Sequence, residues 1–115
     1  MRKVYYLSTC DTCKRIMKEL DLSDFEKQDI KTEPMTAEQV DEMKALAGSY
    51  EALFSKVARK YRALGLNEQA LSEDNFRKHI IEEYTFLKRP VFIIDDQIFI
   101  GNSKKNVAAV ADALK

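Results

Sequence analysis

Residues 3–20, KVYYLSTCDTCKRIMKEL, contain a strand, a turn and the start of a helix in direct succession. The segment Lys3–Leu7 has the apolar character of a short strand, and Ser8 and Thr9 are turn and helix-capping residue types. After them, the apolar residues that recur at the i, i+3, i+4, i+7 spacing of one helical face are Cys13, Ile16, Met17 and Leu20. The sequence therefore places Cys10 at the start of a helix and Cys13 one turn inside it.

The position of Cys10 predicts a reactive thiol. Free N–H groups and the dipole at a helix start stabilise negative charge, so a thiolate there has a lowered pKa and is a nucleophile at neutral pH. Cys13 lies on the apolar face of the same helix and is more shielded. We predict that Cys10 attacks and Cys13 resolves, and that their spacing allows a disulfide between them under mild oxidation.

Two other uses of this C-x-x-C motif remain open. A closed zinc site needs four ligands, and a chain with two cysteines and one histidine would have to add carboxylates. Two buried cysteines can also act as small apolar residues, which suits Cys13 better than Cys10. The strand–turn–helix setting favours redox use, and we expect no metal site.

Length and charge narrow the class of protein. A chain of 115 residues is large enough for one domain with a single core. Its 19 basic and 19 acidic residues cancel, whereas a nucleic-acid-binding protein shows a basic excess. No apolar run is long enough to cross a bilayer, and the start, Met1–Val4, lacks a signal-peptide segment. We expect a cytoplasmic protein with no membrane partner and no direct nucleic-acid partner, where C-x-x-C is catalytic or sensing.

Periodicity and turn residues predict the remaining elements. A weak strand spans 25–30, and a capping-box pattern at Thr36 opens a helix to about residue 46. Pro90 precedes an unbroken apolar run typical of a strand buried on both faces. The other predicted elements are a helix over 50–64 with Leu53, Phe54, Val57, Ala58, Tyr61 and Leu64 on its inner face, a helix from Ser72 to about residue 84, strands at 91–94 and 98–100 around a tight turn, and a last helix capped by Ser103.

The element order is β-α-β, three helices, then β-β-α. A leading βαβ unit followed by a hairpin and a closing helix predicts an α/β protein with a thioredoxin-like sandwich. We expect a single domain over residues 1–115, with the three middle helices, about 36–87, forming an inserted helical lobe.

Three features together resemble one protein family. The motif Cys10–Cys13 lies on the first strand–helix turn, and Leu87–Ile94 resembles the family signature of a basic pair, a proline and an apolar strand. The helical stretch between them and the hairpin ending at Gly101 also fit. Over essentially its whole length the chain resembles the ArsC/Spx family, which comprises arsenate-reductase-like proteins and the Spx redox regulators.

The resemblance implies roles for individual residues. Cys10 matches the nucleophilic cysteine of the family, and Arg89 matches an arginine that helps the reductases to bind the oxyanion. Pro90 matches a proline expected in the cis form beside the active cysteine. The catalytic residues expected on this basis are Cys10, Cys13 and Arg89, and the expected substrate-binding residues are Thr12, Lys14, Arg89, Pro90 and Lys56.

The chain also departs from the reductase pattern. Glutaredoxin-dependent reductases usually have one cysteine in this loop, followed by small polar residues and an arginine, where this chain has Cys13 and Lys14. The family arginine in the helical lobe has no certain counterpart, although Lys56 or Arg59 can substitute, and the arginine after the hairpin is replaced in the region of Gly101. Lysine is a point charge that grips an oxyanion less well than the bidentate arginine.

Two functions follow from the resemblance. The first is an arsenate-reductase-like thiol oxidoreductase, in which Cys10 attacks an arsenate-like oxyanion or a glutathione or protein disulfide, and Cys13 or an external thiol resolves the intermediate. It needs no bound cofactor and draws electrons from glutathione, glutaredoxin or thioredoxin. The second is an Spx-like transcriptional regulator that binds the RNA polymerase alpha subunit and is switched by a Cys10–Cys13 disulfide.

The pair Arg89-Pro90 gives the most specific geometric expectation. Pro90 cannot donate a ladder hydrogen bond, so it fits the first position of its strand. A thioredoxin-like fold would place that strand start beside the Cys10 turn. We predict a cis bond before Pro90 and an Arg89 guanidinium directed at Cys10. The alternative for Arg89 is an exposed basic residue without a role, and the basic residues of 56–62 have the equally plain interpretation of a solvated helix face.

Overall fold

The computed structural model describes all 115 residues and divides them into two compact units. One unit comprises Met1–Pro34 and Arg89–Lys115, and the other is the intervening segment Met35–Lys88. The second unit covers the segment in which we expected a helical insertion. Each unit is described by itself below.

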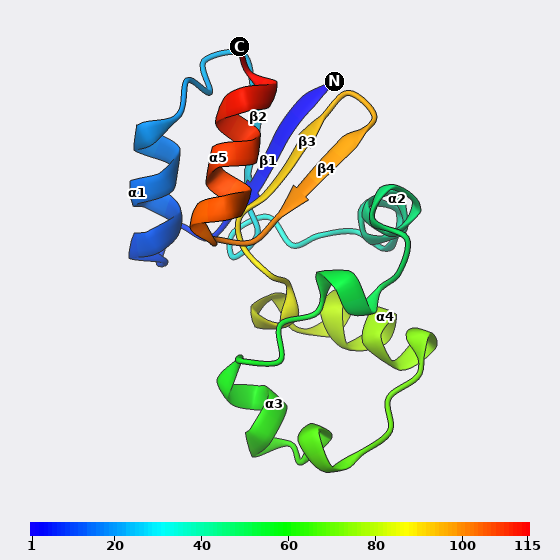
Figure 1. The fold of residues 1–115 in the computed structure, drawn as a ribbon. Helices are drawn as coiled ribbons and strands as arrows, with labels where there is room; N and C mark the ends of the chain where they lie inside the picture. Colours follow the sequence, from blue (N-terminus) through cyan, green and yellow to red (C-terminus); the bar gives the residue numbers. More distant parts are fainter. The chain divides into compact units, whose positions relative to one another are not determined.

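The first unit contains a four-stranded sheet whose strand order is β2-β1-β3-β4 (Figure 1). The strands are β1 (Arg2–Tyr6), β2 (Glu26–Asp29), β3 (Val91–Ile94) and β4 (Gln97–Ile100). Strand β1 pairs in parallel with β2 and antiparallel with β3, and β3 pairs antiparallel with β4. The parallel β1–β2 pair requires a crossover, which helix α1 (Asp11–Glu19) supplies.

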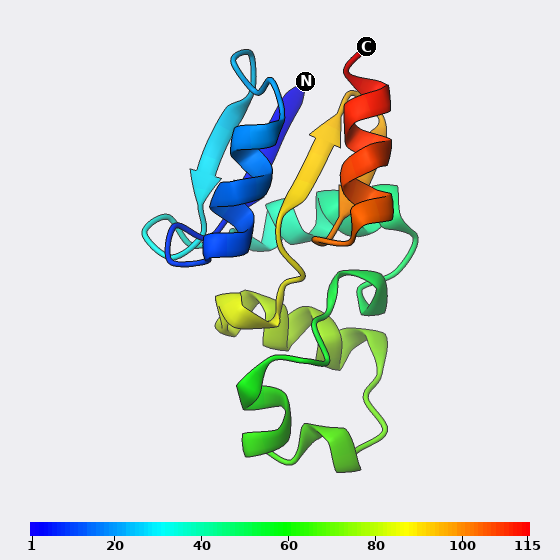
Figure 2. The ribbon, with the colours of Figure 1, turned by 60° about the vertical axis from the view of Figure 1, so that its left-hand side comes forward.

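Helices α1 and α5 (Lys104–Ala113) lie side by side on one face of this sheet (Figures 1 and 2). In β1 and β3 the even-numbered residues point at the helices, and the residues aligned with them in β2 and β4 are odd-numbered, as the strand register and the two-residue period of a strand require. Phe92 packs edge-to-face on Phe25 with ring centroids 6.4 Å apart. The buried residues of this core are Val4, Ile16, Leu22, Phe25, Phe92, Ile94 and Val110.

The expected strands and flanking helices are confirmed. All four residues of β3 are buried, as the unbroken apolar run predicted. Asp95 and Asp96 form the turn to β4 without a glycine, because Asp95 itself takes the left-handed conformation with φ 56°. Ser103 caps α5 by accepting a hydrogen bond from the Asn106 N–H.

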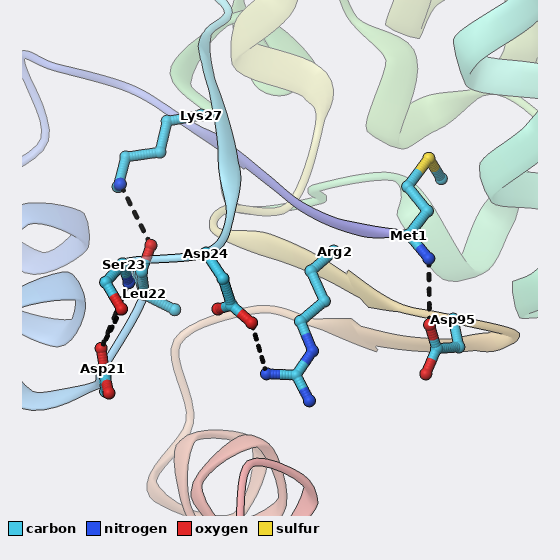
Figure 3. A network of polar contacts seen from close by, with 8 residues as sticks. All are labelled: Met1, Arg2, Asp21, Leu22, Ser23, Asp24, Lys27 and Asp95. Carbon is cyan, nitrogen blue, oxygen red and sulfur yellow. Dashed lines mark hydrogen bonds and ion pairs between the residues drawn. The ribbon is translucent and has the colours of Figure 1, made fainter.

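The end of the sheet where β1 starts is tied by exposed polar contacts (Figure 3). The N-terminal amine of Met1 lies 2.9 Å from Asp95 Oδ1, and Arg2 Nη1 lies 3.0 Å from Asp24 Oδ2. Lys27 donates to the Leu22 carbonyl at 3.1 Å. These contacts join the chain start, the hairpin and the loop before β2, at the opposite end of β1 from the cysteine motif.

The second unit contains helices α2 (Ala37–Ala47), α3 (Arg59–Ala63) and α4 (Glu73–Glu82). Thr36 and Gln39 form the predicted capping box of α2, and Gly48 ends the helix in the left-handed conformation with φ 96°. Ser72 caps α4 by accepting from the Asn75 N–H. Arg77 of α4 holds Asp41 of α2 through two hydrogen bonds of 2.8 and 3.2 Å.

The helix predicted over 50–64 is wrong. The chain there forms a 3-10 turn at Glu51–Leu53, an extended stretch, and the short helix α3, in which no residue is buried. Val57, predicted on the inner face, is 94% exposed, and Leu64 is 57% exposed.

Tertiary pairing explains this difference. The Ser55 N–H donates to the Phe86 carbonyl at 2.7 Å, and the Lys88 N–H donates to the Leu53 carbonyl at 2.8 Å. Phe54 stacks on Phe86 with ring centroids 5.0 Å apart. The extended backbone satisfies its polar groups through residues far along the sequence and buries Phe54, which outweighs a weak local helical preference.

Candidate active site

Cys10 is the residue directly before the first turn of α1. Its backbone is extended, with φ −97° and ψ 108°, and its carbonyl accepts the Lys14 N–H at 3.2 Å to begin the helix. Its own N–H donates to the Leu7 carbonyl at 3.0 Å, which closes the turn between β1 and α1. The predicted helix start at Cys10 is confirmed. The side chain is half-buried and its thiol is free.

The surroundings of Cys10 lower the pKa of its thiol below the ordinary value of 9.0. Burial acts in the opposite direction and raises this pKa. Burial is outweighed by hydrogen bonds from the backbone N–H and the thiol of Cys13, the positive charge of Arg89, and the backbone N–H of Thr12. Donors at the helix start and one guanidinium therefore favour the Cys10 thiolate, as the sequence predicted from the helix start alone.

Cys13 has the opposite character. Its side chain is fully buried, and burial together with the hydrogen bond and charge of Cys10 raises the pKa of its thiol to about 11. A backbone hydrogen bond at Leu7 and the charge of Arg89 oppose this rise. At neutral pH Cys13 is thus a protonated thiol. The motif pairs a thiol of lowered pKa with a thiol of raised pKa.

The predicted cis bond between Arg89 and Pro90 is confirmed. Pro90 directly precedes β3, and its carbonyl accepts the Gly101 N–H at 2.9 Å. The positive charge of Arg89 lowers the pKa of both Cys10 and Cys13, and the pairing of Tyr5 with Val91 places the Arg89-Pro90 segment beside the end of β1. The structure therefore brings together the Cys10 turn and the Arg89-Pro90 segment, which are far apart in the sequence.

The other expected substrate-binding residues differ in position. Thr12 is half-buried and directs its backbone N–H at the Cys10 sulfur. Lys14 is exposed on α1, with its Nζ 3.9 Å from Asp11 Oδ1. Lys56 belongs to the unit Met35–Lys88 and forms an ion pair of 2.7 Å with Glu51. Substrate contacts of these three residues stay predictions.

The sequence analysis missed Asp29 as a residue near the motif. This carboxylate at the end of β2 accepts the N–H of Ser8, two residues before Cys10, at 3.3 Å. A usable signal was present, because a polar residue that ends a parallel strand beside β1 lies next to the loop that follows β1.

No group of three or more histidine, cysteine, aspartate or glutamate side chains is arranged to hold a metal ion. No helix is long and apolar enough to span a bilayer.

A family model described as the ArsC family matches residues 5–110, nearly the whole chain. The chain belongs to the ArsC family. No curated protein matches it. Among solved structures, this ArsC-family protein is similar to SACOL0876 from Staphylococcus aureus COL, with 29% sequence identity, a TM-score of 0.76, and coverage of 95% of this chain and 97% of the other.

Two further structures extend the comparison. A possible arsenate reductase from Streptococcus mutans UA159 is 27% identical, with a TM-score of 0.70 and coverage of 90% of this chain and 92% of the other. An arsenate reductase from Vibrio cholerae has a TM-score of 0.74 over 95% of this chain and 96% of its own, at 18% identity, which shows the fold alone. The predicted α/β thioredoxin-like fold and the ArsC resemblance are both confirmed.

Proposed function

We propose that this ArsC-family protein is a thiol oxidoreductase in which Cys10 is the nucleophile and Cys13 the resolving thiol. The observation that carries the proposal is the contrast between the two thiols. The pKa of Cys10 is lowered by donors at the helix start and by Arg89, whereas Cys13 is buried with a pKa of about 11. Thiol–disulfide exchange begins with attack by a thiolate, which a lowered pKa favours, and a second thiol beside it can resolve the mixed disulfide within the same chain.

The proposed reaction with a disulfide proceeds in two exchanges. The Cys10 thiolate attacks one substrate sulfur, forms a mixed disulfide, and releases the other sulfur as a thiolate. Cys13 then loses its proton, attacks the Cys10 sulfur, and releases the second substrate thiolate, which leaves a Cys10–Cys13 disulfide. The substrate gains two electrons, and an external dithiol or two glutathione molecules return them to the protein.

The first exchange also prepares the second. Two of the causes that raise the pKa of Cys13 are its hydrogen bond to Cys10 and the charge of Cys10. Both disappear when Cys10 enters a mixed disulfide, because its sulfur is then uncharged. Cys13 therefore becomes easier to deprotonate at the moment when its attack is needed.

An oxyanion such as arsenate is the second substrate class within this proposal. The Cys10 thiolate would form a sulfur–arsenic bond and displace one arsenate oxygen, which takes up protons from solvent and leaves as water. Attack of Cys13 or an external thiol on the Cys10 sulfur would then break the sulfur–arsenic bond and leave its electron pair on arsenic as arsenite. Arg89 and the N–H groups of Thr12 and Cys13 are the donors available to hold the anion. Glutathione, glutaredoxin and thioredoxin are the proposed electron donors, and Lys14 and Lys56 are proposed contacts to the substrate.

A second candidate function is a redox-sensing regulator of the Spx type. It is favoured by the hydrogen bond between Cys10 and Cys13, since two thiols in contact need little movement to form a disulfide switch. In this proposal the oxidised protein binds the RNA polymerase alpha subunit. The formal net charge of zero suits a protein partner better than DNA.

One set of assays separates the candidates. Arsenate reduction and reduction of a small disulfide are measured with glutathione plus glutaredoxin and, in parallel, with thioredoxin and its reductase. The oxidoreductase proposal expects turnover in at least one assay, its loss in Cys10→Ser, and retention of only the glutathione-resolved part in Cys13→Ser. No turnover, together with binding of the oxidised protein to the C-terminal domain of a polymerase alpha subunit, would favour the regulator.

A further inference from the structure

Asp29 lies where β2 ends beside the start of the Cys10 turn. In the parallel pairing of β1 and β2, Asp29 stands opposite Tyr6, the last residue of β1. The N–H of Ile30 donates to the Tyr6 carbonyl at 2.9 Å, which extends this pairing by one residue. The backbone around Asp29 is therefore fixed against the point where the chain leaves β1 for Cys10.

The Asp29 carboxylate accepts hydrogen bonds from several donors. Its Oδ1 accepts the Ser8 N–H at 3.3 Å and the Lys31 N–H at 3.2 Å. Burial acts to raise the pKa of Asp29, but hydrogen bonds of the Ser8 hydroxyl, the Lys31 and Ser8 N–H groups and the Thr32 side chain outweigh it and lower this pKa. Asp29 is therefore ionised at neutral pH and holds Ser8 by both its backbone and its side chain.

Ser8 connects Asp29 to the reactive thiol. It is the second residue of the turn Leu7–Cys10, which is closed by the hydrogen bond of 3.0 Å from the Cys10 N–H to the Leu7 carbonyl. The turn sets the backbone of Cys10, and that backbone sets the direction of its sulfur toward the N–H groups of Thr12 and Cys13. A displacement of this turn would move the sulfur away from its donors.

We propose that Asp29 is a positioning residue for Cys10, which fixes the Leu7–Cys10 turn through Ser8 and so holds the sulfur against the donors at the start of α1. The inference deepens the proposed function, since it rests on Cys10 as the reacting thiol. According to this proposal, a residue at the end of β2, outside the C-x-x-C motif, contributes to the reactivity of Cys10. Small displacements of a reacting group are costly in rate, so the effect is measurable.

The direction of the effect separates positioning from simple charge. Asp29 is negative, so removal of its charge alone would make the Cys10 thiolate more favourable and the thiol faster at neutral pH. Loss of positioning has the opposite result, because the sulfur leaves the N–H groups that stabilise its thiolate. Asp29→Ala removes both the charge and the acceptor, and we expect positioning to dominate because Asp29 is not among the largest causes of the shift in the pKa of Cys10.

The test is the pH dependence of iodoacetamide alkylation in the full chain, read for each cysteine by fragmentation of the tryptic peptide 4–14. In Asp29→Ala we expect the Cys10 profile to move to higher pH and the rate near pH 7 to fall about five-fold. Asp29→Asn keeps an oxygen acceptor for Ser8 and should retain most of the rate. Asp24→Ala is the matched control, because it removes a paired aspartate at the other end of β1.

Each outcome bears on the inference. A folded Asp29→Ala variant with an unchanged or faster Cys10 profile overturns it, and so does an equal change in Asp24→Ala. If Asp29→Ala does not fold, Ser8→Ala decides, since it removes only the hydroxyl contact and should slow Cys10 in the same direction by a smaller factor; no change in that variant also overturns the inference. A wild-type Cys10 that reacts like an ordinary thiol would instead count against the proposed function, which keeps the two failures distinct.

Discussion

The Cys13 thiol donates a hydrogen bond to the Cys10 sulfur, and this one contact lowers the pKa of Cys10 while it raises the pKa of Cys13. The two cysteines of the C-x-x-C motif are thus made unlike by each other as well as by their surroundings. Cys10 has donors from the helix start and a neighbouring guanidinium, whereas Cys13 is buried.

Cys10 should be alkylated first. Its pKa lies below the ordinary 9.0, whereas the pKa of Cys13 is about 11, so near neutral pH the thiolate fraction of Cys10 is larger than that of Cys13. Limited iodoacetamide treatment followed by mass spectrometry should find the label on Cys10. Cys13→Ala should slow the labelling of Cys10 because it removes a donor, and Cys13→Ser, which keeps a donor, serves as the control. Preferential labelling of Cys13 in the wild type would contradict the assignment.

Mild oxidation should join Cys10 and Cys13 within one chain. The two thiols are already in hydrogen-bond contact, and both are free in the reduced protein. After treatment with oxidised glutathione or diamide, we expect loss of both free thiols and a mass decrease of two hydrogens in the monomer. The variant Cys13→Ser should give a mixed disulfide or a dimer through Cys10. A wild-type sample that keeps two free thiols, or that forms only dimers, would show that the pair does not close.

Arg89→Ala should slow Cys10 with little loss of stability. The positive charge of Arg89 lowers the pKa of both thiols, so its removal should shift the alkylation profile of Cys10 to higher pH. The alkylation rate near pH 7 should fall about three-fold. Arg89→Lys keeps the charge and should lie between the two, although its single ammonium grips an oxyanion less well. Thermal unfolding checks that the fold is intact. An Arg89→Ala variant with the wild-type alkylation profile and wild-type turnover would show that Arg89 has no role at the site.

Asp41 should make the stability of the second unit sensitive to acid. Hydrogen bonds from Arg77 and Tyr50 lower its pKa from 3.8 to about 2. A carboxyl whose folded pKa is depressed contributes stability above its ordinary pKa and loses it as the pH falls from about 4 to about 2. Arg77→Ala should therefore lower the melting temperature at pH 7, and the difference from wild type should shrink over that acid range. An exposed pair, Lys115 with Asp112, provides the control. An Arg77→Ala difference that is constant with pH would contradict this role.

Phe54 and Val57 should respond to mutation in opposite ways. Phe54 is 1% exposed, and Phe54→Ala should cost about 3–5 kcal/mol of unfolding free energy through the cavity that it leaves. Val57 is 94% exposed, so Val57→Ser should change this free energy by no more than about 0.5 kcal/mol. Urea denaturation measures both. Comparable losses in the two variants would support a single helix over 50–64. They would contradict the turn, the extended stretch and α3 that the structure has there.

The elements that could be predicted correctly are those whose signals are local in the sequence. The helix start at Cys10, the capping box at Thr36 and the buried strand Val91–Ile94 each follow from a short pattern in which side chain, backbone and period agree. The lowered pKa of Cys10 was predictable for the same reason, because the donors of a helix start are a property of the helix. The family resemblance added the expectation of a cis bond before Pro90, which the structure confirms.

Other features depend on residues that are distant in the sequence. Phe54 lies in a segment with a helical period but forms an extended bridge with Leu87, because the hydrogen bonds of its neighbours Leu53 and Ser55 and the ring contacts of Phe54 outweigh a weak local preference. The hold of Asp29 on Ser8 and the effect of Arg89 on both thiols likewise arise where strands bring separate segments together. Local patterns determine which cysteine begins the helix and which lies one turn inside it. The packing of the sheet determines the chemical environment of their thiols.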